Sequence, residues 1–264
     1  MTRGLLALLS LVAAALLYAG PSGAIVNGQL DGNLHPQVGA LIAEYVQPGE
    51  KNVLCSGSLI APTVFLTAAH CTDFLASLGI TDVWVTFDSQ FTSSSKLIHG
   101  SYVTDPAYNA YAGKGGSSDP HDLAVVLLDK AAKGITPVRL PTAGLLESLD
   151  LGSQSFTAVG YGTVRSSSTT GPNAFFFDST RRYATQSSLS LEPAWLNLSE
   201  NPSTGSGGTC YGDSGGPHFL GDVTSNLQVA ITVTGDAVCR ATDKTYRLDT
   251  ASARDFLGHY LTLP

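Results

Sequence analysis

Short apolar runs, separated by loops rich in glycine, serine and proline, are the feature that most constrains how this chain can fold. Runs of this length bounded by turn-forming residues are typical of β-strands, whereas a helical bundle needs longer stretches with helical spacing. The expected strands are Val53–Ile60, Val64–Thr67, Val83–Phe87, Leu123–Leu128, Phe156–Val159, Leu227–Val233 and Tyr246–Leu248. The sequence therefore predicts an all-β protein, built as a sandwich or as barrels.

Three further segments predict a turn, a terminal helix and a division between two halves of the chain. Ala61-Pro62-Thr63 predicts a turn that folds the first two strands back on each other. Ala251–Leu261 carries apolar side chains at helical spacing, which predicts one terminal helix docked on the body. A division of the chain near Pro141–Gly152 would give two halves of similar size.

Residues 1–24 have the pattern of a secretory signal peptide. Arg3 precedes the apolar stretch Leu5–Leu17, and small residues stand one and three positions before residue 25. As a helix this stretch would span about 20 Å, which is shorter than the roughly 30 Å hydrocarbon core of a membrane. We therefore expect a secreted protein, extracellular or periplasmic, with no membrane anchor in its mature form.

Export would place the four cysteines in an oxidising compartment, where pairing is favoured over free thiols. Four cysteines allow three connectivities. We expect Cys55–Cys71 and Cys210–Cys239, because each bridge closes a local loop and leaves the two halves of the chain free to fold separately. No Cys-x-x-Cys motif or Cys/His cluster has the spacing of zinc ligands, and no acidic loop suggests calcium, so we expect no metal and no other cofactor.

The charge of the chain limits its partners. Lys and Arg number 14 against 21 Asp and Glu, which gives a net charge of −7 at pH 7. Such a chain has no basic surface with which to hold a phosphate backbone, so the sequence argues against a nucleic-acid partner.

The segment Gly212–Pro217 carries the clearest chemical signal. Glycines on both sides of Ser214 let the backbone turn tightly and leave the hydroxyl exposed beside free N–H groups. A serine is a weak nucleophile until a base takes its proton, and that base needs a carboxylate to orient it. His70, at the end of an expected strand, and Asp122, at the start of another, are the candidates.

These segments resemble the signature segments of the chymotrypsin/trypsin-like serine proteases. The similarity lies in Thr67–Cys71, Asp122–Leu128 and Gly212–Pro217, in the order His, Asp, Ser, and also in Ile25–Gly28, Cys55–Ile60 and Val159–Gly162. The resemblance extends over the whole mature chain and implies two Greek-key six-stranded β-barrels packed together. The first barrel would cover about residues 25–145, the second about 150–250, and the terminal helix about 251–262.

The resemblance also implies an activity. The chain would be a secreted serine endopeptidase in which Ser214 is the nucleophile, His70 the general base and then acid, and Asp122 the group that orients His70. Backbone N–H groups of Gly212 and Ser214 would form the oxyanion hole. The expected partners are protein or peptide substrates, and protein inhibitors are possible.

Asp213 allows two interpretations. It could be the partner of Ser214, but it fits better as the carboxylate that pairs with a buried N-terminal amine, that of Ile25. The residues before Ile25, Ser22-Gly23-Ala24, include no basic residue of the kind at which zymogens of the family are usually cut. We therefore expect that removal of the signal peptide alone frees the amine.

The remaining histidines match no catalytic segment. His121 should diverge from Asp122, because successive side chains of a strand point to opposite faces. The others are expected on the surface or in structural hydrogen bonds; they are His35, His99, His218 and His259.

The resemblance also predicts some residues of the substrate pocket. In the family that the chain resembles, the residue six positions before the nucleophile lies at the base of the pocket. In this chain that residue is Gly208, so the carboxylate with which trypsin selects Lys or Arg is missing. Gly235 is expected at one wall and Lys244 near the opposite wall. A lysine pointing inward would favour an acidic side chain before the cut bond; a lysine pointing outward, which is more frequent, leaves a neutral pocket. We expect the neutral pocket, and not trypsin-like specificity.

Two other functions compete with the endopeptidase as interpretations of the sequence. A catalytically silent relative that uses the fold as a binding module would need none of His70, Asp122 and Ser214, and all three are present. An esterase with a Gly-x-Ser-x-Gly elbow would carry its acid and histidine after the serine, whereas both precede Ser214 in this chain.

Overall fold

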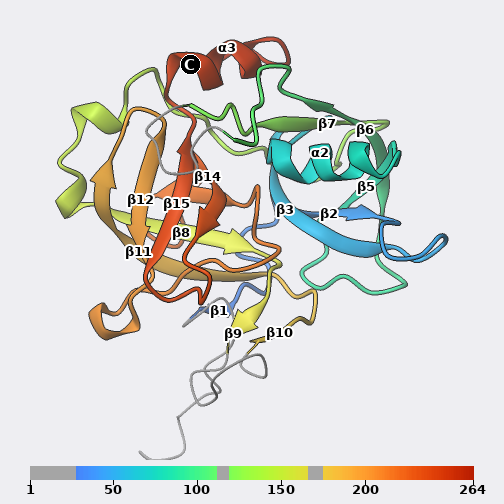
Figure 1. Cartoon of the computed structure of the whole chain (residues 1–264), viewed down its shortest axis with the longest axis horizontal. Helices are drawn as coiled ribbons and strands as arrows, with labels where there is room; N and C mark the ends of the chain where they lie inside the picture. The colour runs from blue at the N-terminus through green and yellow to red at the C-terminus, as the bar shows by residue number, and fades with distance from the viewer. Residues whose placement is uncertain (1–27, 112–118, 166–174) are drawn as a thin grey trace, which may run out of the picture.

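The strands form two closed antiparallel barrels of six strands each, which lie side by side (Figure 1). The computed structural model describes residues 28–111, 119–165 and 175–264. The predicted signal peptide and Ile25 lie outside these residues. Within them, no helix has the length and apolar character that crossing a membrane requires. The all-β class and the two-barrel architecture are confirmed.

The N-terminal barrel closes in the order β2-β3-β4-β7-β6-β5. Its strands are β2 (Val38–Ala43), β3 (Asn52–Ala61), β4 (Val64–Thr67), β5 (Asp82–Thr86), β6 (Ile98–Thr104) and β7 (Ala124–Leu128). The hairpin expected at Pro62 joins β3 to β4, and β4 pairs in turn with β7. The core of this barrel is apolar, with Leu41, Phe65 and Val125 fully buried.

The C-terminal barrel runs β11-β12-β15-β14-β13-β8, and β8 pairs back with β11 to close it. Its strands are β8 (Ser155–Gly160), β11 (Arg182–Leu191), β12 (Trp195–Ser199), β13 (Pro217–Leu220), β14 (Gln228–Gly235) and β15 (Thr242–Arg247). Outside the barrel, β1 (Gln29–Leu30) pairs with β11, and β9 (Val164–Arg165) pairs with β10 (Phe175–Phe176). Single-turn helices cover Leu146–Ser148, Leu151–Ser153 and Pro202–Thr204.

Two α-helices complete the fold. Helix α2 (Ala69–Ser77) follows β4 directly. The expected terminal helix is α3 (Ala251–Gly258), at the top of Figure 1, and it is shorter than its apolar spacing suggested. Thr250 caps α3 by accepting a hydrogen bond from the Ala253 N–H, which satisfies one of the free donors of the first turn.

All seven expected strands are present, although β15 begins at Thr242, four residues before the expected Tyr246. The elements that were not expected are β1, β2, β6, β9, β10, β11, β12, β13 and α2. The largest of these, β11, has the segment RYATQSSLSL, in which polar residues dominate. Its pairing with both β8 and β12, rather than an apolar pattern, makes it a strand.

A buried ionic network joins the two barrels. Arg181, which immediately precedes β11, is fully buried, and its Nε lies 2.7 Å from Asp31 Oδ2. Its Nη1 donates to the carbonyl oxygens of Val38 and Phe87, at 2.8 and 3.0 Å. Burial raises the pKa of Asp31, but the hydrogen bonds and charges of His35 and Arg181 outweigh it and hold the pKa below its usual range. The network therefore carries a charged pair that the surrounding protein has fully desolvated.

Removing one partner of this pair should destabilise the protein strongly, because the other charge stays buried and unpaired. We predict that Asp31→Asn lowers the free energy of unfolding by about 3 kcal/mol, measured by urea denaturation. Combining it with Arg181→Met should cost less than the sum of the two single changes. As a control, Glu44→Gln breaks the partly exposed Glu44–Lys51 pair and should leave stability nearly unchanged. Equal effects of Asp31→Asn and Glu44→Gln would contradict the assignment.

Candidate active site

His70 and Asp122 meet at neighbouring strand ends of the N-terminal barrel. His70 lies in the first turn of α2, directly after β4, and Asp122 lies just before β7, which pairs with β4. Asp122 Oδ2 is 2.9 Å from His70 Nδ1, and Oδ1 accepts a hydrogen bond of 2.9 Å from the His70 backbone N–H. Asp122 is buried, whereas the His70 side chain is about one-third exposed. The two contacts fix the imidazole so that Nε2 is its free ring nitrogen.

The loop that carries Ser214 comes from the C-terminal barrel and is fastened to the first barrel. The Ser56 N–H of β3 donates to the Ser214 carbonyl oxygen at 2.9 Å, and Ser56 Oγ donates to the Gly212 carbonyl oxygen at 3.0 Å. Gly215 has φ +79°, and a Cβ there would lie 2.3 Å from Thr67 Oγ1 and 2.7 Å from the Ala68 nitrogen. Only glycine allows this approach, which brings the serine loop against the segment leading to His70.

Ser214 itself is free to react. Among the described residues, no hydrogen bond joins its Oγ to the His70 ring or to any other group. In unliganded active sites this bond is often long, and it tightens when substrate binds.

Two backbone donors beside Ser214 point to an anion site. In the described structure the N–H groups of Gly212 and Ser214 have no acceptor, whereas those of Asp213, Gly215 and Gly216 are hydrogen-bonded to carbonyl oxygens. Gly212 has φ +95°, a backbone conformation that residues with a side chain rarely adopt. The loop therefore has two unused donors, on either side of Asp213, with which it could hold a developing negative charge.

Asp213 is fully buried and turned away from Ser214. Its Oδ1 accepts from the Gly162 N–H at 2.8 Å, and its Oδ2 from the Cys210 N–H at 2.9 Å. Side chains at Gly160 or Gly162 would overlap the carboxylate, since a Cβ there would lie 2.1 or 2.4 Å from its oxygens. Burial raises the pKa of Asp213 to about 7. No basic group of the described chain forms an ion pair with it, and its expected partner Ile25 lies outside that part.

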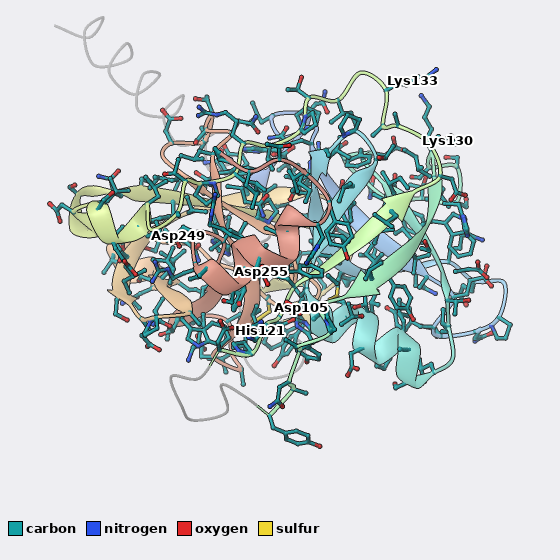
Figure 2. All side chains as sticks on the ribbon, turned by 90° about the horizontal axis from the view of Figure 1, so that it is seen from above. Asp105, His121, Lys130, Lys133, Asp249 and Asp255 are labelled. Atoms are coloured by element: carbon teal, nitrogen blue, oxygen red, sulfur yellow. A yellow bond between two sulfur atoms is a disulfide. The ribbon has the colours of Figure 1, made fainter. Side chains whose placement is uncertain are left out.

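His121 does not take part in the contact between His70 and Asp122. Its φ is +52°, and its Nδ1 lies 3.6 Å from Asp105 Oδ2. Figure 2 shows Asp105 and His121 side by side. The expected divergence from Asp122 is therefore seen.

Beside Ser214 a cavity of about 350 Å³ opens into the C-terminal barrel. Its lining consists of Thr209, Cys210, Tyr211, Ser214, Thr232, Val233, Thr234, Gly235, Asp236, Ala237 and Cys239. Gly235 lies at the wall, where it was expected. Gly208 does not line the cavity, and Lys244 is directed away from it, with Nζ 4.5 Å from the centre of the Trp195 ring and 3.9 Å from Glu192 Oε2.

Both predicted disulfides are formed. Cys55–Cys71 braces β3 against the start of α2, and Cys210–Cys239 joins two walls of the cavity. In the described part of the chain, Cys55, His70 and Cys71 bring potential metal ligands within 4.8 Å of one another. The two sulfur atoms are bonded to each other, so neither is a thiolate that could bind a metal ion.

Two buried acids near the cavity, Glu200 and Asp243, were not among the expected site residues, whereas His218 makes a structural hydrogen bond of the kind expected for it. Asp243 is the inward neighbour of Lys244 on β15, and its Oδ2 accepts from Gln186 Nε2 at 3.0 Å. His218 Nε2 lies 2.9 Å from Thr232 Oγ1 and 3.4 Å from Asp243 Oδ2. Glu200 accepts from the Thr209 N–H at 2.7 Å. The alternation of side chains along the expected strands was the available signal, but β12 and the start of β15 were not predicted.

His218 gives the stability of the protein a dependence on pH. Burial lowers the pKa of His218 to about 3, from 6.5 for an exposed histidine. Between these values the unfolded chain binds a proton that the folded chain does not, so stability falls as pH falls. We predict that His218→Gln flattens this dependence, with a difference in slope of about 1.4 kcal/mol per pH unit between pH 6 and 4. Urea denaturation across this range checks it, and parallel curves for both proteins would contradict it.

Comparison with known proteins agrees with this geometry. The sequence matches the family model described as Trypsin over residues 43–255. It is 30% identical, over 193 residues, to a trypsin-like protease of Streptomyces glaucescens, which covers 71% of this chain and 67% of that protein. The solved structure of HL collagenase has a TM-score of 0.64 at 19% identity and covers 89% of this chain and 97% of that chain, a likeness of fold. The family match spans well over half of the chain and includes His70, Asp122 and Ser214, and the chain therefore belongs to the trypsin family.

Proposed function

We propose that this protein is a secreted serine endopeptidase that hydrolyses peptide bonds through an acyl-enzyme. The family and fold support a peptidase, that is, a hydrolase acting on peptide bonds. The observation that carries the finer assignment is the double contact of Asp122 with the ring and the backbone of His70. It orients the imidazole so that Nε2 is free to accept a proton, next to a loop that presents an unbonded serine hydroxyl.

In the proposed reaction, Ser214 Oγ attacks the carbonyl carbon of the substrate while its proton passes to His70 Nε2. Asp122 stabilises the imidazolium that forms. The C–N bond then breaks as His70 returns the proton to the leaving amine, which gives the acyl-enzyme. Water repeats the sequence: His70 takes its proton, the new C–O bond forms, and Ser214 leaves with the proton.

The N–H groups of Gly212 and Ser214 are the proposed oxyanion hole. Negative charge develops on the carbonyl oxygen as the tetrahedral intermediate forms, and two preorganised donors stabilise that charge more than they stabilise the neutral substrate. Support comes from the unused state of these two donors in a loop whose other N–H groups are bonded.

A serine-directed phosphonate tests the assignment. We predict that it labels Ser214, located by mass spectrometry, and that His70→Ala slows labelling and peptide cleavage by about 10⁴-fold or more, because the base is lost. Ser225→Ala, which changes a serine of an outer turn, serves as the control and should label like the unchanged protein. Absence of an adduct at Ser214 would favour the silent binding module.

Secretion and activation belong to the same proposal. Bonding of all four cysteines supports an oxidising compartment. The Ile25 amine would pair with Asp213: β1 pairs with β11 at Leu30↔Arg182, and β11 pairs with β8 at Arg182↔Gly160, where the Asp213 carboxylate is packed. Two strand spacings are about 10 Å, and the five residues from Ile25 to Leu30 can span about 17 Å. An ammonium there would favour the ionised form of Asp213.

N-terminal sequencing of the secreted protein tests this activation. We predict a start at Ile25 and a loss of about tenfold or more in kcat/KM when one alanine is added before Ile25, because the amine is displaced from its buried partner. Full activity of a protein that starts well away from Ile25 would contradict the proposal.

A further inference from the structure

The carboxylate of Asp122 is hydrogen-bonded to one residue only. Its two oxygens contact the ring and the backbone N–H of His70, and no other group of the described chain donates to them. The rest of the support for its position must therefore come from the backbone segment that carries it, residues 119–123.

This segment has an unusual conformation immediately before Asp122. His121 has φ +52°, in the left-handed region that residues with a side chain rarely adopt. The Leu123 N–H donates to the His121 carbonyl oxygen at 2.8 Å, which closes a three-residue turn with Asp122 at its centre. A backbone conformation of this kind costs free energy and persists only where neighbouring groups hold it.

The side chain of Asp119 holds the N–H group of this turn. Its Oδ1 accepts from the His121 N–H at 2.9 Å, two residues along the chain, which is an Asx turn. The carbonyl oxygens of Pro120 and Leu123 accept backbone hydrogen bonds from the segment 105–109. The acceptor for the His121 N–H in the described chain is the Asp119 carboxylate, so this side chain completes the support of the turn.

Asp119 is in turn fixed by the other barrel and by α3. Its Oδ1 also accepts from the hydroxyl of Tyr246 at 2.7 Å, and its Oδ2 accepts from the hydroxyl of Ser252. Tyr246, on β15, is fully buried, and Ser252 lies in the first turn of α3. Burial raises the pKa of Asp119, but the hydrogen bonds from Ser252, Tyr246 and the His121 N–H outweigh it and hold the pKa below its usual range. An ionised carboxylate therefore joins the C-terminal barrel to the turn that carries Asp122.

We propose that Asp119 is a positioning residue of the active site: through the His121 N–H it holds Asp122 in the orientation that His70 requires. The inference rests on the proposed function, because it assumes that Asp122 acts in catalysis. The alternative is a purely structural role, in which Asp119 stabilises the joint between β15, α3 and the first barrel. Its loss would then lower stability without changing the turnover of the folded protein.

Replacing the carboxylate by an apolar group of similar shape separates the two roles. For Asp119→Leu we expect kcat to fall by about 10- to 100-fold while KM stays within about twofold, because Asp122 leaves its productive orientation and the substrate contacts remain. Asp119→Asn keeps an oxygen that can accept from the His121 N–H and should recover most of the lost kcat. Asp222→Leu is the matched control: Asp222 forms the same Asx turn with the Thr224 N–H, at 2.9 Å, in the exposed loop after β13, and its change should leave kcat as it is.

Proton NMR reports on the position of Asp122 without any turnover. In the unaltered protein, the proton on His70 Nδ1 should give a low-field signal, because its acceptor is a carboxylate. In Asp119→Leu this signal should move upfield or broaden beyond detection, whereas Asp119→Asn and Asp222→Leu should keep it. A loss of stability alone would leave the signal of the folded protein unchanged.

A second variant covers the case in which Asp119→Leu does not fold. Tyr246→Phe combined with Ser252→Ala removes both hydroxyls that fix Asp119 and keeps the buried ring, and we expect kcat to fall by about threefold or more. An unchanged kcat, or an unchanged low-field signal, in a folded variant overturns the proposal and leaves the endopeptidase intact. Absence of cleavage and of the Ser214 adduct in the unaltered protein overturns the endopeptidase, whereas the NMR signal still decides whether Asp119 positions Asp122.

Discussion

The contacts of one buried serine hold the two halves of the candidate active site together. Ser56 of β3 donates its N–H to the Ser214 carbonyl oxygen and its hydroxyl to the Gly212 carbonyl oxygen, while that hydroxyl accepts from the Tyr161 N–H. Its own carbonyl oxygen accepts from Thr67 Oγ1, three residues before His70. The loop from one barrel is thus fixed against the segment that bears the histidine of the other. Every distance in the proposed chemistry depends on this junction.

The buried charges divide into two kinds. Away from the cavity they are balanced: Arg181 pairs with Asp31 between the barrels, and Arg247 pairs with Asp249 near α3. Around the cavity, Asp213, Glu200 and Asp243 form no ion pair with a Lys or Arg of the described chain, and burial lowers the pKa of His218, which lies beside Asp243. Balanced pairs fix geometry at little net cost or gain, whereas unbalanced acids keep raised pKa values and attract cations. The proposed partner of Asp213 is the Ile25 amine.

Local motifs explain why much of the site could be predicted. His70, Asp122 and Ser214 each lie in a short segment with its own turn chemistry, and the cysteines close local loops. Predicting the three residues and the disulfides therefore required no knowledge of distant contacts. The cavity could not be predicted in this way, because its walls come from β14, from the loop that follows β14 and from the loop between β12 and β13. Without β12, nothing in the sequence brought Glu200 close to Gly208. Without the register of β15, the sequence could not show which of Asp243 and Lys244 faces the interior of the barrel. A shift of the strand by one residue would turn Lys244 inward in place of Asp243.

The most direct test of the central claim is a crystal structure of the phosphonate adduct. We expect a bond between phosphorus and Ser214 Oγ, with a phosphoryl oxygen about 3 Å from the backbone nitrogens of both Gly212 and Ser214. His70 Nε2 should lie within hydrogen-bond distance of Ser214 Oγ, with Nδ1 still on Asp122. An adduct on another residue, or a Ser214 that stays out of reach of His70, would contradict it.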